Sequence, residues 1–286
     1  MTTIDQAQAL RQSERELSGD KVRAERAAAT RRLRRSLLNV AIRVASLSVF
    51  LLLWEWTGGQ VDPILFTTPS AVAKAAVEMI RSGELWTYLW PSLKVLMIGF
   101  TLAVVFGIGI GLLLARYWVL DVALSVYITF LYSIPSVALV PLIVLWAGYE
   151  DTAKVIILFM FAFFPMVINT YQGVKAVDPK LIEVGRAFRS SERQLWTNIV
   201  IPASLPFIVT GLRLALGRGL IGMVLADLYT ALSGIGYLIA RTAATYQVNR
   251  MFVPIVTLGI LGVTLTALLR LAEKHVAPWT NVPDEN

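Results

Sequence analysis

The sequence contains no cysteine and a single histidine, His275. Without cysteine, the chain cannot form a disulfide, a thiolate metal site or a cysteine nucleophile. Without a pair of histidines, it cannot hold haem between two imidazoles or build a multi-histidine zinc site. We therefore expect no redox or metal chemistry, and we assign no metal ligand and no catalytic residue to this chain.

Charge is also scarce, since 16% of the 286 residues are charged whereas 56% are hydrophobic. Soluble domains carry about 25% charged residues, and one core of this length cannot bury so much apolar surface. The excess must face lipid, which excludes a water-soluble enzyme. A disordered chain is excluded as well, because disorder needs low hydrophobicity. The composition predicts an all-α integral membrane protein.

Six apolar segments are long enough to cross a bilayer, because about 20 helical residues span the hydrocarbon. The third segment contains Ser133-Ile134-Pro135-Ser136 and Pro141, which predicts a kinked or broken helix. The first span is expected over 37–57, and a core of five spans over 92–271. Within that core we expect the spans at 92–115, 120–147, 152–174, 203–228 and 251–271.

The basic residues predict the orientation of these spans. The chain has 26 Lys and Arg residues and a formal charge of +7. Seventeen lie in segments on the side of the N-terminus, six on the opposite side and three within spans. By the positive-inside rule, both the basic tail over 1–36 and the tail over 272–286 are cytoplasmic. Since this distribution accounts for the positive charge, we expect a lipid bilayer and no nucleic acid as partner.

The predicted extracytoplasmic loop over 58–91 contains a helix signal. Thr68-Pro69-Ser70 is a cap followed by proline, and Val72, Ala76, Met79 and Ile80 follow at helical spacing. Gly83 closes the segment. We interpret it as a short amphipathic helix on the outer interface; a plain solvated helix would give the same pattern.

The predicted cytoplasmic loop over 178–202 has the clearest start signals. Asp178-Pro179 is an N-cap followed by proline, which predicts a helix through Phe188. Ser191 and Gln194 have the spacing of a capping box, which predicts a second helix through Asn198. We therefore expect a small helix-turn-helix in this loop.

The loop also carries a specific resemblance. Glu183, Ile199 and Pro202 have the spacing of the EAA loop of ABC-importer permeases, with small or apolar replacements between them. Arg189 stands where that pattern has a turn glycine, which usually supplies a positive φ. Other segments between 60 and 275, including Gly211-Leu212-Arg213-Leu214-Ala215-Leu216-Gly217-Arg218, are similar to the nitrate, sulfonate and taurine permease group of these importers.

This resemblance implies the transmembrane-domain fold of an ABC type I importer in the bacterial inner membrane. It also implies partners: a second copy of the chain, two cytoplasmic ABC ATPase subunits and an extracytoplasmic solute-binding protein. The first helix of the loop would be the coupling helix that docks on the ATPase. The implied coupling residues are Glu183, Val184, Gly185, Arg186, Ala187, Phe188, Arg189 and Pro202.

Nucleotide chemistry is expected outside this chain. None of its seven lysines follows a glycine, so the sequence has no Gly-Lys-Ser/Thr phosphate loop. We expect the partner ATPase to bind ATP and Mg²⁺, and we expect no cofactor in this chain.

Two arginines, Arg213 and Arg218, fall within the fifth span, where charges are costly and point to function by default. Arg213 is close enough to the inner end of the span to reach the headgroups. Arg218 is nearer the midplane and needs a partner, backbone carbonyls or an aqueous path. For Arg218, pairing with Asp227 and contact with substrate both remain open.

The broken third span supplies further candidates for the transport pathway. A helix break exposes carbonyls that only a protein-buried or watery setting can satisfy. Tyr132, Ser133 and Ser136 flank the break at Pro135, and with Arg218 they are our pathway candidates. Simple helix packing would equally explain these three residues.

Two functions fit the sequence. The first, which the resemblance implies, is the permease subunit of an ATP-driven importer for a small organic or inorganic anion such as a sulfonate, taurine or nitrate. An aromatic or pyrimidine compound is the alternative cargo of the same importer class. The second is a secondary transporter driven by an ion gradient. That mechanism favours carboxylates or histidines embedded in the membrane, and only Glu55 and Asp227 lie near span ends. An intramembrane enzyme lacks a nucleophile-base or metal set.

Overall fold

The computed structural model describes residues 34–35 and 37–276, with side chains through Lys274. Most of the predicted tails over 1–36 and 272–286, and the side chain of His275, lie outside these residues. Every regular element in the described part of the chain is helical. The chain divides into two units, Met1–Val61 and Asp62–Asn286.

The first unit contains the apolar helix Leu37–Gly58. Its 22 residues extend over about 33 Å, enough to cross the hydrocarbon.

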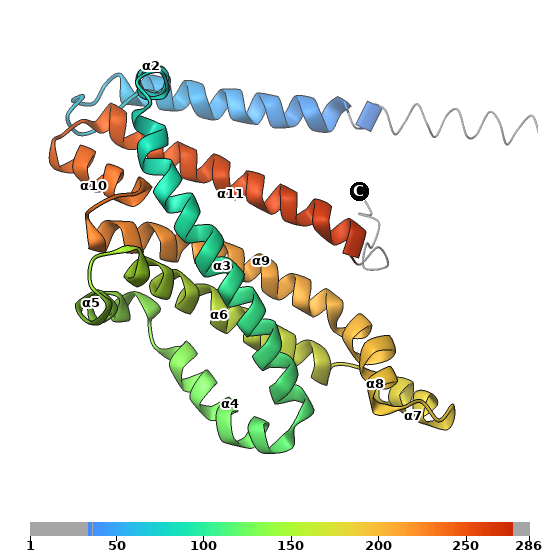
Figure 1. Ribbon diagram of the computed structural model, residues 1–286. Helices are drawn as coiled ribbons and strands as arrows, with labels where there is room; N and C mark the ends of the chain where they lie inside the picture. The colour runs from blue at the N-terminus through green and yellow to red at the C-terminus, as the bar shows by residue number, and fades with distance from the viewer. Residues whose placement is uncertain (1–33, 36, 277–286) are drawn as a thin grey trace, which may run out of the picture. The chain divides into compact units, whose positions relative to one another are not determined.

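The second unit contains the rest of the helices (Figure 1). Their bounds are α2 Pro69–Arg81, α3 Glu84–Arg116, α4 Trp118–Ser133, α5 Ser136–Ala147, α6 Asp151–Lys175, α7 Pro179–Ala187, α8 Glu192–Leu195, the π-helical turn η1 Trp196–Val200, α9 Ile201–Thr230, α10 Ile235–Ala244 and α11 Val248–Val276.

The third predicted span is broken, as its proline indicated. α4 and α5 meet at a bend of 97°. Ile134 ends α4 with an extended ψ of 130°, the conformation that a following proline favours. Pro135 then caps α5. The prediction of a kinked or broken helix is confirmed.

The packing of α3 against α6 shows that this broken pair crosses the bundle. Gly99 and Gly111 of α3 face Leu158 and Thr170 of α6, so α3 and α6 run parallel. The segment between two parallel helices must return across the bundle. Asp121, near the start of α4, pairs with Lys175 at the end of α6 over 3.1 Å. The α4–α5 pair is therefore a broken span rather than a re-entrant loop.

The other long helices alternate in direction. Gly211 and Gly222 of α9 face Asn169 and Phe161 of α6, an antiparallel order. α11 packs on α9 at Gly262, and Figure 1 shows it running in the same direction as α6. The second unit thus has five crossings, and helix Leu37–Gly58 makes a sixth candidate. The sides on which the two chain ends lie stay a prediction.

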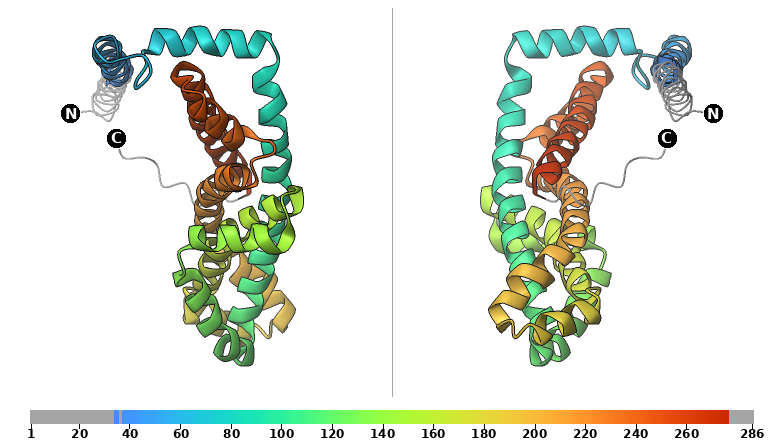
Figure 2. Two further views of the ribbon diagram at one scale, coloured as in Figure 1. Left: turned by 90° about the vertical axis from the view of Figure 1, so that its left-hand side faces the viewer. Right: turned by 90° about the vertical axis from the view of Figure 1, so that its right-hand side faces the viewer.

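The predicted loop over 58–91 holds a helix, but α3 begins within it. α2 starts at the Thr68 cap, whose side chain accepts a hydrogen bond from the Ala71 amide. α3 begins at Glu84, eight residues before the predicted span. Its 33 residues extend over about 50 Å, which is longer than the hydrocarbon is thick. Figure 2 shows α2 lying across the end of the bundle, nearly perpendicular to α3.

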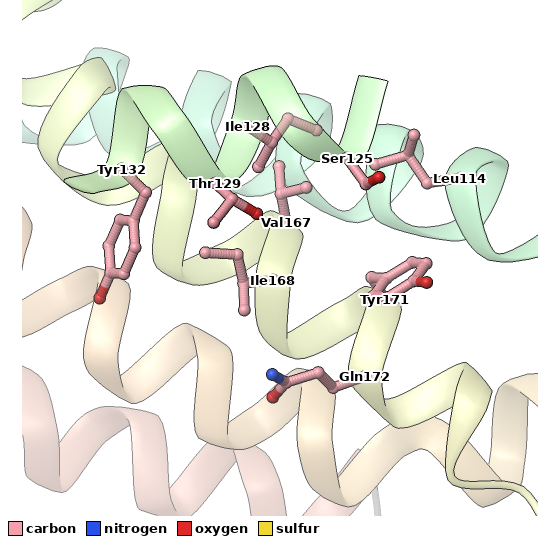
Figure 3. A pocket seen from close by; sticks show the side chains of 9 residues that line it. All are labelled: Leu114, Ser125, Ile128, Thr129, Tyr132, Val167, Ile168, Tyr171 and Gln172. Atoms are coloured by element: carbon pink, nitrogen blue, oxygen red, sulfur yellow. The ribbon is translucent and has the colours of Figure 1, made fainter. Parts of the chain in front are cut away.

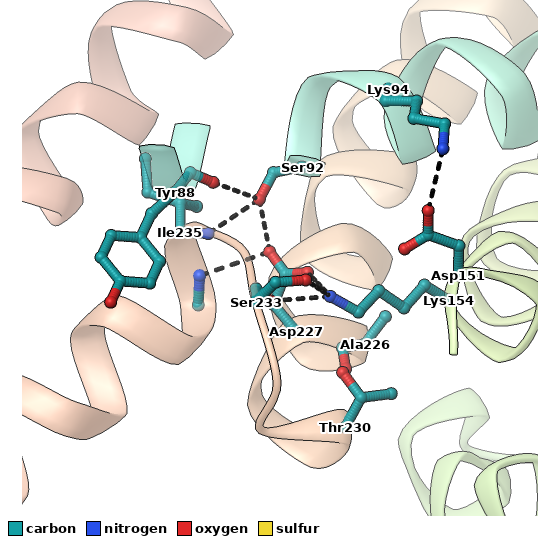
Figure 4. A network of polar contacts seen from close by, with 11 residues as sticks. Tyr88, Ser92, Lys94, Asp151, Lys154, Ala226, Asp227, Thr230, Ser233 and Ile235 are labelled. Atoms are coloured by element: carbon teal, nitrogen blue, oxygen red, sulfur yellow. Dashed lines mark hydrogen bonds and ion pairs between the residues drawn. The ribbon is translucent and has the colours of Figure 1, made fainter. Parts of the chain in front are cut away.

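A buried ion pair joins four elements at the end of the bundle near α10 (Figure 4). Lys154 of α6 and Asp227 of α9 lie 3.0 Å apart with side chains 1% and 0% exposed. The Lys154 ammonium also donates to the backbone and hydroxyl oxygens of Ser233. Ser92 of α3 donates to Asp227 and accepts from the amide of Ile235 at the start of α10. Asp227 is thus the partner of Lys154, and the pairing of Asp227 with Arg218 that we left open does not occur.

We predict that Asp227→Asn destabilises the chain strongly. It keeps the shape of the side chain but leaves the Lys154 charge buried without a counter-ion, which costs about 3–5 kcal/mol. Thermal unfolding of the purified chain in detergent should show a midpoint lower by roughly 10 °C.

The matched control is Asp151→Asn, which breaks the half-exposed Lys94–Asp151 pair. That change should cost at most ~1 kcal/mol. Equal midpoints for the two variants would contradict a structural role for the buried pair.

Candidate functional site

The candidate site is built around α7, which begins as its sequence predicted. The Asp178 side chain accepts a hydrogen bond from the amide of Lys180 over 2.9 Å. Pro179 occupies the first turn, where its missing N–H is not needed. The helix ends at Ala187, one residue before the predicted end at Phe188.

α7 closes with a Schellman motif in which Arg189 takes the place of glycine. The Ser190 amide donates to the Gly185 carbonyl, and the Arg189 amide donates to the Arg186 carbonyl. This pattern requires a left-handed residue at Arg189, and its φ is +55°. The turn therefore keeps the geometry that glycine would give, although a side chain is present.

The second helix of the loop differs from its prediction. Ser191 and Gln194 form the predicted capping box, but the helix does not end at Asn198. It continues through η1 into α9, so that one helical run extends over Glu192–Thr230. Pro202 explains η1, because its ring would clash with the Asn198 carbonyl in a regular α-helix. The wider turn pairs the Ile201 amide with the Trp196 carbonyl.

Gly185 fixes α7 against this long helix. A Cβ on Gly185 would lie 2.5 Å from the Leu195 side chain and 2.8 Å from that of Ile199. Both distances are too short for real contacts, so a larger residue would require the Leu195 and Ile199 side chains to shift. α7 is thus held closely at the start of the run that becomes α9.

The outward side of α7 is apolar. Leu181, Val184 and Phe188 recur at helical spacing and are 48%, 54% and 82% exposed. We call these three residues the α7 apolar face. Sequence reasoning missed Leu181, although its spacing from Val184 and Phe188 was a usable signal.

The other predicted coupling residues surround this face. Glu183, Ala187 and Arg189 are exposed. Arg186 lies 4.0 Å from Glu192, and both side chains are about two-thirds exposed. Pro202 lies apart from this group, at the start of α9.

The structure places the predicted pathway residues in different surroundings. Tyr132 lines a cavity of about 310 Å³ between α4 and α6, where Figure 3 shows it with Thr129, Tyr171 and Gln172. The Ser133 hydroxyl instead donates to the Thr129 carbonyl within its own helix. Ser136 is the first residue of α5. Of the four pathway candidates, only Tyr132 lines this cavity.

The two arginines of α9 have different surroundings. Arg213 binds both carboxylate oxygens of Glu273 on α11. Arg218 is exposed, and no hydrogen bond or ion pair involves it within the described residues. The neighbouring Gly219 packs against Ala162, near the middle of α6. Arg218 therefore lies about halfway through the bundle.

We predict that Arg189→Gly stabilises the C-terminal turn of α7. A non-glycine residue in the left-handed region costs about 1 kcal/mol, so removing it should slow hydrogen exchange of the Ser190 amide about fivefold. Arg193→Gly, which removes the same side chain inside α8, should speed exchange there because glycine weakens helices. Faster hydrogen exchange of the Ser190 amide in Arg189→Gly would contradict the view that the positive φ of Arg189 is strained.

Comparisons with known proteins identify the family. The family model of the binding-protein-dependent transport system inner membrane component matches residues 103–282. The aliphatic sulfonates transport permease protein SsuC of Bacillus subtilis is 33% identical over 82% of this chain and 86% of its own. The formylaminopyrimidine transport permease protein ThiX of Halalkalibacterium halodurans is 30% identical over 81% and 92%.

A solved structure has the same fold. An amino acid ABC transporter aligns with a TM-score of 0.54 at 20% identity, over 70% of this chain and 98% of that one. Between the two functions that fit the sequence, the family decides for the importer over the secondary transporter. The chain therefore belongs to the binding-protein-dependent transport system inner membrane components, as a multi-pass permease of an ABC importer.

Proposed function

We propose that two copies of this permease enclose a path for a small organic or inorganic anion. Two ATPase subunits bind ATP and Mg²⁺ at the cytoplasmic ends, and a solute-binding protein delivers the anion from outside. The α7 end of the bundle is cytoplasmic in this proposal, as the distribution of basic residues predicts.

The α7 apolar face supports the coupling role. A capped, nine-residue helix with exposed Leu181 and Val184, followed directly by exposed Phe188, is typical of a helix that inserts into a groove of a partner. Gly185 and the Schellman motif hold this helix in one place. The partner is proposed to be the ATPase, because the loop matches the coupling segment of the importer permeases.

The continuous helical run from α8 into α9 supports a direct mechanical connection between α7 and the transport path. α7 packs on Leu195 and Ile199, and the run Glu192–Thr230 carries these two residues and Arg218 alike. Its 39 residues extend over about 58 Å, roughly twice the hydrocarbon thickness. A displacement of α7 by the closing ATPases would therefore move the helix that lines the path.

Arg218 supports an anionic cargo. A guanidinium halfway through the bundle cannot face lipid at low cost, so its side of α9 must face a second copy or water. Phe207, Leu214 and Ile221 lie exposed along the same side. In a two-fold dimer through this side, the two Arg218 side chains would repel each other, and an anion between them would relieve that repulsion.

We predict that Phe188→Asp uncouples hydrolysis from transport. A charge forced unpaired into the interface typically costs about 2–5 kcal/mol, which weakens ATPase binding more than tenfold. The assay is co-purification with the ATPase, followed by solute-stimulated hydrolysis. Asn198→Asp is the matched control, because it adds the same charge at an exposed position of η1.

Glu183→Lys tests the helix by reversing a charge, with Glu192→Lys as its control. Glu192 is exposed, and within the described residues its one ion pair is the 4.0 Å contact with Arg186. Loss of that pair should cost at most ~1 kcal/mol. If all four variants assemble and hydrolyse like the parent, α7 is not the coupling helix.

We predict that Arg218→Met lowers uptake of an alkanesulfonate more than tenfold, because the path loses its cation. Arg218→Lys should retain most uptake, since it keeps the charge. Both variants should assemble with the ATPase and hydrolyse ATP at the basal rate. Sulfonate uptake by Arg218→Met at the parental rate, or uptake of a neutral pyrimidine instead, would overturn the anionic cargo.

A further inference from the structure

A second cavity lies at the joint between α7 and the spanning helices. It has a volume of about 460 Å³. Its walls come from the end of α3, the end of α6, the inner side of α7 and the α8–η1 segment. Figure 1 shows α7 and α8 projecting beyond the bundle at the end where α3 and α6 finish.

The cavity is lined with excess positive charge. Arg116, Lys175 and Arg186 line it, against the single carboxylate of Glu192. Lys175 forms an ion pair with Asp121 over 3.1 Å. Among the described residues, Arg186 pairs only with Glu192, at 4.0 Å.

Arg116 is the least neutralised of the three cations. Its guanidinium lies 5.0 Å above the Trp196 ring and 5.6 Å from that of Tyr117. These rings orient the cation without cancelling its charge. No carboxylate pairs with it in the part of the chain that the structure describes.

Aromatic side chains place the cavity at the membrane surface. Tyr117 and Trp118 are exposed at the corner between α3 and α4, and Trp196 lines the cavity itself. Such residues collect at the level of the lipid headgroups. From that corner, Val119, Val122 and Val126 form an exposed apolar strip along α4, which suits an acyl chain.

We propose that this cavity binds the phosphate of an anionic phospholipid. Basic pockets between spanning helices are suited to such headgroups, and here the cations come from both sides of a joint. Arg116 and Lys175 belong to the spanning helices, whereas Arg186 belongs to α7. A bound phosphate would tie α7 to the bundle from the side opposite the α7 apolar face, and would leave that face free.

Binding of the lipid does not depend on the proposed cargo or on the coupling role of α7. The test uses the full permease–ATPase complex and native mass spectrometry, which counts retained lipid. Phosphatidylglycerol is offered in one arm, phosphatidylcholine in a second and inorganic phosphate in a third. The parent should retain phosphatidylglycerol, and neither of the other two should replace it.

The variant Arg116→Gln/Lys175→Gln should lose at least about tenfold of this retention, because each basic residue contributes to the attraction of an anionic lipid. Lys180→Gln/Arg193→Gln is the matched control. It removes two exposed charges from the same end of the chain, and neither residue lines the cavity. The control should retain the lipid like the parent.

A third variant, Arg116→Lys, keeps the charge while it changes the contact with Trp196, and it should retain most of the lipid. Equal loss in the cavity variant and the control would show unspecific attraction and overturn the site. Displacement of the lipid by inorganic phosphate, or equal retention of phosphatidylcholine, would overturn it as well.

Discussion

Close approach of the backbones of α3, α6 and α9 is the constraint on which the bundle depends. Lipid tails are as apolar as leucine, so burial alone does not drive spanning helices together. Here glycines remove the side chains that would separate them. A Cβ on Gly107 would lie 2.7 Å from that of Met166, and one on Gly211 would lie 2.8 Å from that of Asn169. α6 is held between its two neighbours by van der Waals contact over most of its length.

The tight central packing gives α9 a fixed course through the bundle. One end of the helical run Glu192–Thr230 packs against α7, and the other end carries Asp227, which forms the ion pair with Lys154. Gly234 lets the chain turn tightly over that carboxylate, since it adopts a φ of +103° and any Cβ there would collide with Asp227. The ion pair thus anchors the start of α10 as well as the end of α9. A rigid α9 between two anchored ends suits the proposed transmission of a displacement from α7.

The local features of the fold could be predicted from the sequence. The cap at Asp178, the capping box at Ser191 and the break before Pro135 depend on neighbouring residues, and each appears in the structure. The spans could be predicted because apolar length alone determines them. The coupling role of the loop over 178–202 is implied only by the family resemblance. Composition and caps alone do not distinguish this loop from an ordinary capped loop.

Features that depend on distant contacts could not be predicted. Lys154 is one of the six basic residues that the sequence places on the side opposite the N-terminus, yet its ammonium is buried against Asp227, 73 residues away. Similar glycines also have different roles. Gly107 touches α6, whereas a Cβ on Gly109 or Gly217 would meet nothing within 4 Å. Helical periodicity cannot tell which side of a helix finds a neighbour.

The π-helical turn η1 affects the direction in which α7 lies around the axis of α9. An α-helix turns by about 100° per residue, so one extra residue in a regular α-helix would rotate everything before it by more than a quarter turn. A π-turn is wider and takes up its extra residue within the turn. η1 therefore keeps the direction of α7 around the axis of α9 close to the direction that an unbroken α-helix would give. Pro202 thus interrupts the hydrogen bonds of the long helix without rotating its two ends relative to each other.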